Sequence, residues 1–175
     1  MTNSGKSLVT VAEALKMLRL YIVMERLRFD NTFDDTITYT HAVGVETLMV
    51  PPLLLQPFCE NAIWHGFMNL PDRQTGKDGG APIHISIRTE DDLFECVITD
   101  NGIGRKKAAE FKSRSARKER SLGLNITRER LLLFGEENNT EANFEMEDLA
   151  DENGNSTGTR VILRIADKKA IEKPA

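Results

Sequence analysis

The stretch that decides the fold is LLLQPFCENAIWHGF, Leu53–Phe67. Its apolar residues predict a helix, and Pro57 fits the first turn, where a missing N–H costs nothing. Glu60, Asn61 and His65 interrupt the apolar run, and the last two are four residues apart and share a face. An amide oxygen suits Mg²⁺, and a carboxylate beside it can orient or deprotonate a nucleophile. A helix end with polar residues at the surface is the other interpretation, and this stretch alone leaves both open.

Length and composition bound the class of protein. The chain has 175 residues, of which 40% are hydrophobic and 29% charged, which suits one domain with a short attached element. A net charge of −4 gives no sign of a nucleic-acid partner. Neither a signal-peptide pattern nor an apolar run of membrane-spanning length is present, so we expect a soluble chain without direct membrane contact. Cys59 and Cys96 have no metal-site spacing, and we interpret them as buried thiols of a cytoplasmic protein.

A second periodic segment, Leu8–Phe29, predicts a long helix. No Gly or Pro interrupts it, and residues recur at spacings of three and four along an apolar stripe broken only by its last member: Leu8, Val11, Leu15, Leu18, Ile22 and Glu25. Two interpretations stay open for this stripe. It packs on its own domain, or it belongs to a coiled coil or a dimer.

Alternating residues predict five strands, with turns at Gly44 and around Asn153-Gly154: Thr36–Thr40, Ile83–Arg88, Leu93–Thr99, Ala142–Leu149 and Thr159–Ile165. Between the third and fourth strands we expect a basic segment, then a helix that opens at a turn around Gly123 and is capped by Gly135. Runs of strands between helices favour an α+β fold, a two-layer sandwich of a mixed sheet with helices on one face, preceded by one long helix.

TDNGIG, Thr99–Gly104, places an acid at the end of a strand and two glycines after it. A buried carboxylate accepts a hydrogen bond well from an exocyclic amine such as that of adenine. Gly102 and Gly104 let the backbone approach a flat base without a Cβ in the way. Taken alone, an ordinary turn after a strand explains Asp100 and its neighbours equally well.

Two further glycine motifs follow. SLGLNITRERL, Ser121–Leu131, places a glycine where a helix start would turn backbone N–H groups toward an anion. TGTRVIL, Thr157–Leu163, enters the last strand. Each has a simple turn as its alternative, but four such signals in a fixed order are stronger than any one of them.

In that order, PFCENAIWHG, DNGIG, SLGLNITRERL and GTRVIL resemble the N box and the three glycine boxes of the histidine-kinase ATP-binding domain. This is the Bergerat-type fold shared with DNA gyrase, heat-shock-90 chaperones and MutL repair ATPases. The run from Leu55 to Gly66 matches the pattern LQPxxENAxxHG of LytS-type sensor histidine kinases. The resemblance covers residues 8–165.

The resemblance implies an ATP site. Asn61 would coordinate Mg²⁺ between the phosphates, and Asp100 would bind the adenine amino group. Gly102 and Gly104 would line the base pocket, with Thr159 nearby.

The resemblance also implies contacts around the nucleoside and phosphates. His65 would lie beside the nucleoside, and Gly123 and Leu124 would help to close a lid and cradle the phosphates. The lid would be Arg105–Arg120, which carries eight Lys or Arg and two Glu and which we expect to be disordered without nucleotide. Glu60 lies in the family run one step from Asn61 and is a candidate catalytic carboxylate.

The family further implies three parts: residues 1–30 as the end of a dimerisation and phosphoacceptor hairpin, 31–167 as the ATP-binding domain, and 168–175 as a disordered tail. The γ-phosphoryl group would pass to a histidine upstream of this chain and then to an aspartate of a response regulator. The phosphoacceptor motif PHFLFN is absent here. We therefore expect a cytoplasmic catalytic fragment of a dimeric sensor whose parent is anchored in the inner (cytoplasmic) membrane.

Three positions depart from the family pattern. Pro57 stands where several superfamily members carry an acid, Trp64 where many kinases have Lys or Arg, and Ser121 where a glycine is frequent. They motivate an alternative, a degenerate domain that serves as a dimerisation or interaction module without turnover. A stand-alone protein-serine kinase of the anti-sigma type is a third hypothesis, which the LytS-type run disfavours.

Overall fold

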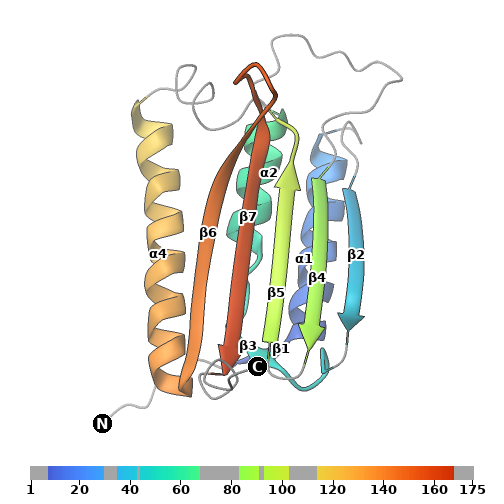
Figure 1. The fold of residues 1–175 in the computed structure, drawn as a ribbon, viewed down its shortest axis with the longest axis vertical. Coiled ribbons are helices and arrows are strands. Elements are labelled where there is room, and N and C mark those ends of the chain that lie inside the picture. The colour runs from blue at the N-terminus through green and yellow to red at the C-terminus, as the bar shows by residue number, and fades with distance from the viewer. Residues whose placement is uncertain are drawn as a thin grey trace.

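The computed structural model describes residues 8–29, 35–42, 44–67, 83–90, 93–102 and 114–167. Five strands form one sheet in the order β2-β4-β5-β7-β6 (Figure 1): β2 (Asp35–Ala42), β4 (Ile83–Glu90), β5 (Leu93–Asp100), β6 (Thr140–Ala150) and β7 (Ser156–Asp167). β2 runs parallel to β4, and the other neighbours are antiparallel. The mixed sheet is the one predicted from the alternation.

Among the described residues, three helices make the second layer, on one side of the sheet (Figure 1): α1 (Val11–Arg28), α2 (Gln56–Phe67) and α4 (Arg114–Asn138). The strands turn alternate residues toward them, as predicted, and the buried set includes Ile83, Ile85, Ile87, Phe94, Cys96, Ile98, Val161, Leu163 and Ile165. The opposite face carries polar cross-strand pairs such as Arg164 with Glu95, 2.7 Å apart. Within the described ranges, every helix is too short or too polar to traverse a lipid bilayer.

Helix α1 begins with a complete capping box. The Thr10 hydroxyl accepts the Glu13 N–H at 3.1 Å, and the Glu13 carboxylate accepts the Thr10 N–H at 2.8 Å. The next two amides of α1 donate to the carbonyls of Leu48 and Val45, at 2.9 and 2.8 Å. The short strands β1 (Val9–Thr10) and β3 (Met49–Val50) pair beside them. The start of α1 is thus fastened to the segment that leads into α2.

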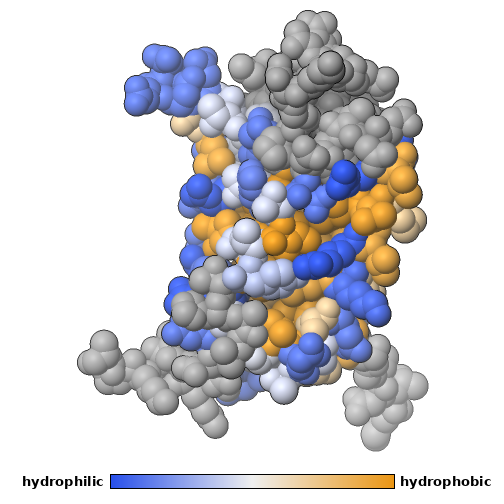
Figure 2. All heavy atoms as spheres, turned by 90° about the vertical axis from the view of Figure 1, so that its right-hand side faces the viewer, coloured by the Kyte–Doolittle hydropathy of each residue, from blue (hydrophilic) through white to orange (hydrophobic). Residues whose placement is uncertain are grey.

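The apolar stripe predicted on α1 packs on its own domain, so the simpler of the two interpretations is confirmed for this face. Its buried apolar members belong to the common core, namely Val11, Leu15, Leu18 and Ile22, and Ala14 is buried beside them. A second face of α1, which we call the outer face, carries apolar residues that are 38–67% exposed: Met17, Leu20, Val23, Met24 and Leu27. Figure 2 shows apolar side chains gathered on this side of the molecule. The boundary near residue 30 between two parts stays a prediction.

Helix α4 corrects the expected position of a helix between Gly123 and Gly135. It begins at Arg114, runs through both glycines and ends at Asn138. Asn139 takes the left-handed conformation that ends it, with φ of 53°. A Cβ at Gly135 would stand 2.8 Å from the Thr140 carbonyl oxygen, so this glycine serves the close approach of β6 and is not a cap.

The same helix corrects part of the expected lid. Residues 114–120 are helical, so the prediction of disorder over Arg105–Arg120 is wrong for that part, and residues 105–113 lie outside the described ranges. Lys, Arg and Glu are good helix formers, and their charge alone does not unfold a segment. The predicted disordered tail, 168–175, also lies outside the described ranges.

Candidate functional site

The site is built around Asp100, the last residue of β5. Its side chain faces the helices and is only 4% exposed. One carboxylate oxygen accepts the Gly102 N–H at 3.0 Å, and the backbone N–H of Thr159 also donates to this group. Burial raises the pKa of Asp100 from 3.8 to about 6, against the lowering effect of the two N–H donors. Asp100 is therefore an acceptor-rich group that has lost most of its water.

Thr159 lies directly opposite Asp100 in the β5–β7 register. Its hydroxyl is buried and has no hydrogen-bond partner among the described residues. A buried hydroxyl without a partner costs roughly 1–3 kcal/mol, so its place beside a hollow indicates a missing ligand or water. The buried Asp100 carboxylate and the unpartnered Thr159 hydroxyl thus lie at the same point of the site.

Gly158 makes this juxtaposition possible. Its φ is 141°, and a Cβ there would stand 1.9 Å from the Asp100 carbonyl oxygen. Only glycine lets β7 come this close to the end of β5. The second residue of the TGT motif is thus required by packing around the site, a role that the turn interpretation missed.

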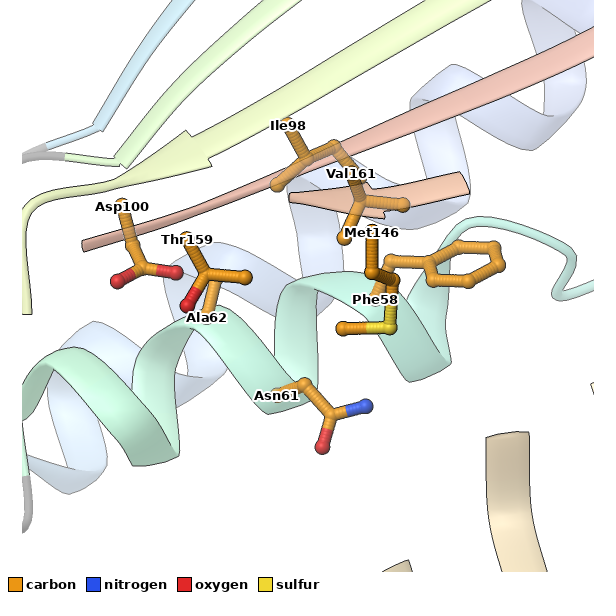
Figure 3. Close-up of a pocket in the computed structure, with 8 residues that line it drawn as sticks. All are labelled: Phe58, Asn61, Ala62, Ile98, Asp100, Met146, Thr159 and Val161. Carbon is orange, nitrogen blue, oxygen red and sulfur yellow. The ribbon is translucent and has the colours of Figure 1, made fainter. Parts of the chain in front are cut away.

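A small hollow between α2 and the sheet has Asp100 and Thr159 at one end, next to Ala62 (Figure 3). Its other lining residues are Phe58, Asn61, Ile98, Met146 and Val161. Figure 3 shows Phe58 and Met146 toward the other end and the Asn61 amide on the rim, on α2. Its free volume is about 10 Å³, room for about one water molecule. A flat base would enter only if a lining side chain moved, and Met146 is an adaptable candidate for that movement.

The structure brings three of the predicted site residues together at this hollow: Asn61, Asp100 and Thr159. Gly102 is buried, and its N–H donates to the Asp100 carboxylate. Glu60 is exposed and is not among the lining residues. His65 belongs to α2, but its side chain lies outside the described part, as does the whole of Gly104.

Gly123 and Leu124 are not at a helix start, as the anion-binding argument required. They lie well inside α4, where the Gly123 carbonyl accepts the Thr127 hydroxyl at 3.0 Å and Leu124 packs against the core. Backbone N–H groups inside a helix are engaged by the preceding turn. This arrangement gives the two residues no open anion cradle.

The sequence does not indicate the apolar lining as a unit, because its members come from four separate elements. Phe58 is held by Phe144 of β6, with ring centroids 4.8 Å apart, and the Arg128 guanidinium stacks on Phe144 at 4.3 Å. The alternation of residues along β7 does predict that Val161 faces the helices. No local pattern indicates that Met146 reaches the same hollow.

The fold is similar to that of solved proteins. No protein-family model matches the chain. The nucleotide-free catalytic domain of the histidine kinase ThkA aligns with a TM-score of 0.54 at 17% identity, over 92% of this chain and 97% of that domain. A second nucleotide-free structure of ThkA aligns with a TM-score of 0.52 at 14% identity, over 92% and 96%. The fold is that of a histidine-kinase catalytic domain, as predicted.

Similar sequences are found among sensor histidine kinases. LytS, a sensor histidine kinase/phosphatase of Staphylococcus aureus, is 30% identical over 106 residues, 60% of this chain and 17% of LytS. A sensor-like histidine kinase of Staphylococcus epidermidis is 32% identical over 96 residues, 55% of this chain and 17% of that protein. YwpD of Bacillus subtilis is 26% identical over 121 residues, 69% of this chain and 40% of YwpD. The predicted resemblance to LytS-type sensor histidine kinases is confirmed, and the chain spans less than half the length of each relative.

Proposed function

We propose that this domain binds ATP in the hollow between α2 and the ends of β5 and β7. The observation that carries the proposal is the buried Asp100 carboxylate beside the Thr159 hydroxyl, which has no partner among the described residues, next to an apolar lining. An adenine amino group would donate to the Asp100 carboxylate while its ring lies against Ile98 and Val161. Gly102 and Gly104 follow Asp100 and would border the base, and His65 would lie beside the nucleoside.

Asn61 would hold Mg²⁺ through its amide oxygen. The donor set fits, because Mg²⁺ takes few protein ligands and fills its shell with phosphates and water. Mg²⁺, when bound, supplies charge neutralisation of the phosphates. The amide stands at the rim, on the same helix as the apolar lining residues Phe58 and Ala62, so phosphates would extend from the hollow toward it. Contact of phosphates with Gly123 and Leu124 would require α4 to unwind before Gly123.

We further propose that the domain is the catalytic part of a LytS-type sensor kinase. The γ-phosphoryl group of ATP would pass to a histidine elsewhere in the parent protein and then to an aspartate of a response regulator. The protein's contribution to such an in-line transfer is positioning and charge stabilisation. Glu60, exposed beside Asn61, would orient the acceptor, so Glu60→Gln should slow transfer and leave ATP affinity unchanged.

The parent would be a homodimer anchored in the cytoplasmic membrane, with this domain in the cytoplasm. Because the inner stripe of α1 is used within the domain, the dimer contact would use the outer face. Four of its residues follow the three-four-three spacing of a coiled-coil seam: Met17, Leu20, Met24 and Leu27.

Calorimetric titration with ATP, with and without Mg²⁺, tests the proposal. We expect metal-dependent binding that Asp100→Asn abolishes and Asn61→Ala reduces to the metal-free level. Arg164→Gln, on the opposite face of the sheet, is the matched control and should bind as the unaltered chain does. Binding that survives Asp100→Asn would place the nucleotide elsewhere.

The small volume of the hollow favours the second candidate, a domain that keeps the fold and serves as an interaction module without ATP. Unaltered protein that stays empty at millimolar ATP, in either the presence or the absence of Mg²⁺, would support this candidate and refute the first.

A further inference from the structure

Helix α2 follows a bend that is both strained and exposed. Leu53 has φ of 57°, a left-handed conformation that is sterically strained for a residue with a Cβ. Its side chain is 48% exposed, so its own packing does not hold it there. Strain of this kind persists only where the surroundings fix it.

The bend determines how α2 enters the core. Leu54 and Leu55, the next two residues, are each 2% exposed. The Leu55 carbonyl accepts the Cys59 N–H at 3.2 Å, the first bond of the helix. Asn61 follows half a turn later on the same rigid element. A change at Leu53 would therefore shift or tilt the helix that carries the proposed metal ligand.

One long-range contact holds the bend from outside. The Arg130 guanidinium on α4 donates to the carbonyl of Pro52 at 3.0 Å, across 78 positions of sequence. A charged donor on a neutral carbonyl makes one of the stronger hydrogen bonds. Arg130 is half-buried and forms no ion pair among the described residues. Within that part of the chain, its guanidinium is held by the hydrogen bond to the Pro52 carbonyl.

The two helices are otherwise joined by few contacts. The buried face of α4, with Leu131 and Phe134, packs mainly toward β6 and the core. Arg130 stands beside that face and reaches across to the segment before α2. It is placed to fix the angle between the helix that leads from the expected lid and the helix that carries Asn61.

We infer that Arg130 is a positioning residue: by holding the Pro52 carbonyl it keeps the Leu53 bend and thereby sets Asn61 for the metal-bound phosphates. Asp100 is on β5 and does not depend on this contact. Loss of Arg130 should then weaken the phosphate end of the site more than the adenine end, where β5 holds Asp100. The nucleotide part of this inference rests on the proposed function.

Arg130→Met removes the donor and keeps most of the side chain's length, and Arg130→Lys is the conservative rescue. Arg164→Gln again serves as a control for loss of one partly exposed cation. The first measurement is amide hydrogen exchange of the peptide spanning residues 53–61, which needs no ligand. We expect exchange to be several-fold faster in Arg130→Met, intermediate in Arg130→Lys and unchanged in Arg164→Gln.

The second measurement compares Kd for ATP with Mg²⁺ and Kd for adenosine. We expect Arg130→Met to weaken the binding of ATP with Mg²⁺ about tenfold and the binding of adenosine by much less. Equal weakening of both ligands would indicate general loosening and overturn the inference, as would unchanged exchange. If the unaltered chain binds no nucleotide, the proposed function fails, and hydrogen exchange still decides whether Arg130 holds α2.

A Leu53→Gly background checks the physical cause. Glycine adopts the left-handed bend without strain, so Arg130→Met should accelerate exchange less in that background. An undiminished effect would refute the role given to the strained bend. Should Arg130→Met fail to fold, the same comparisons are made with Arg130→Lys.

Discussion

Replacing Gly158 with alanine should damage both stability and the site. The added Cβ would stand 1.9 Å from the Asp100 carbonyl oxygen, and ordinary contact begins at 3.4 Å, so the two strands must separate by about 1.5 Å. Overpacking and the positive φ of 141° together should cost about 2–5 kcal/mol of unfolding free energy. The shift also moves the Thr159 N–H away from Asp100, so ATP affinity should fall by about ten- to a hundredfold.

Gly154 offers a matched control. Its φ is 79°, but a Cβ there meets nothing within 4 Å, so Gly154→Ala should cost only about 1 kcal/mol and leave binding unchanged. Urea unfolding gives the stabilities, and calorimetry at a temperature where both variants are folded gives the affinities. If Gly158→Ala matches Gly154→Ala in stability, the close approach of β7 to β5 is not what glycine provides. If it binds ATP as the unaltered chain does, the Asp100–Thr159 pair is not the binding point.

Three other expectations are open to direct measurement. Because burial raises the pKa of Asp100 from 3.8 to about 6, its ionisation makes the folded state lose stability as pH rises through this window. Asp100→Asn should therefore gain about 1–3 kcal/mol over the unaltered chain near pH 8 and nothing near pH 4, by urea unfolding; a gain independent of pH would refute this cause. Burial also raises the pKa of the Cys59 and Cys96 thiols, so neither should react with a thiol reagent before unfolding, and fast labelling of either would contradict their burial. Sedimentation should show concentration-dependent dimers that Leu20→Glu and Leu27→Glu disrupt, whereas a monomer at all concentrations would remove the outer face as a dimer contact.

The strands and the buried faces of the helices could be predicted because they are local periodic patterns. Ile83, Ile85 and Ile87 alternate toward the helices, and this alternation survives folding without help from distant residues. The acid of TDNGIG could also be placed, because its position at the end of a buried strand fixes where Asp100 points.

The other features of the fold and site depend on contacts between residues far apart in the sequence, which no local pattern contains. Gly135 was expected to cap a helix, but its lack of a side chain is needed by a carbonyl of β6. The high charge of the first part of α4 is typical of a disordered segment, but its Lys, Arg and Glu residues favour a helix. The bend at Leu53 is fixed by Arg130, 77 positions further along, and a strained residue of this kind has no signature in its neighbours.

The contacts at the two ends of α1 determine how this helix can move. Its first two amides are bonded to the carbonyls of Leu48 and Val45, and β1 pairs with β3, just before the Pro52–Leu53 bend. Ion pairing of Arg26 with Asp35, 3.3 Å apart, holds the other end of α1 to β2. Because α1 is bonded at both ends, it cannot move relative to its neighbours without breaking one of these contacts. A displacement of the start of α1 would therefore be passed through these hydrogen bonds to the segment that leads into α2.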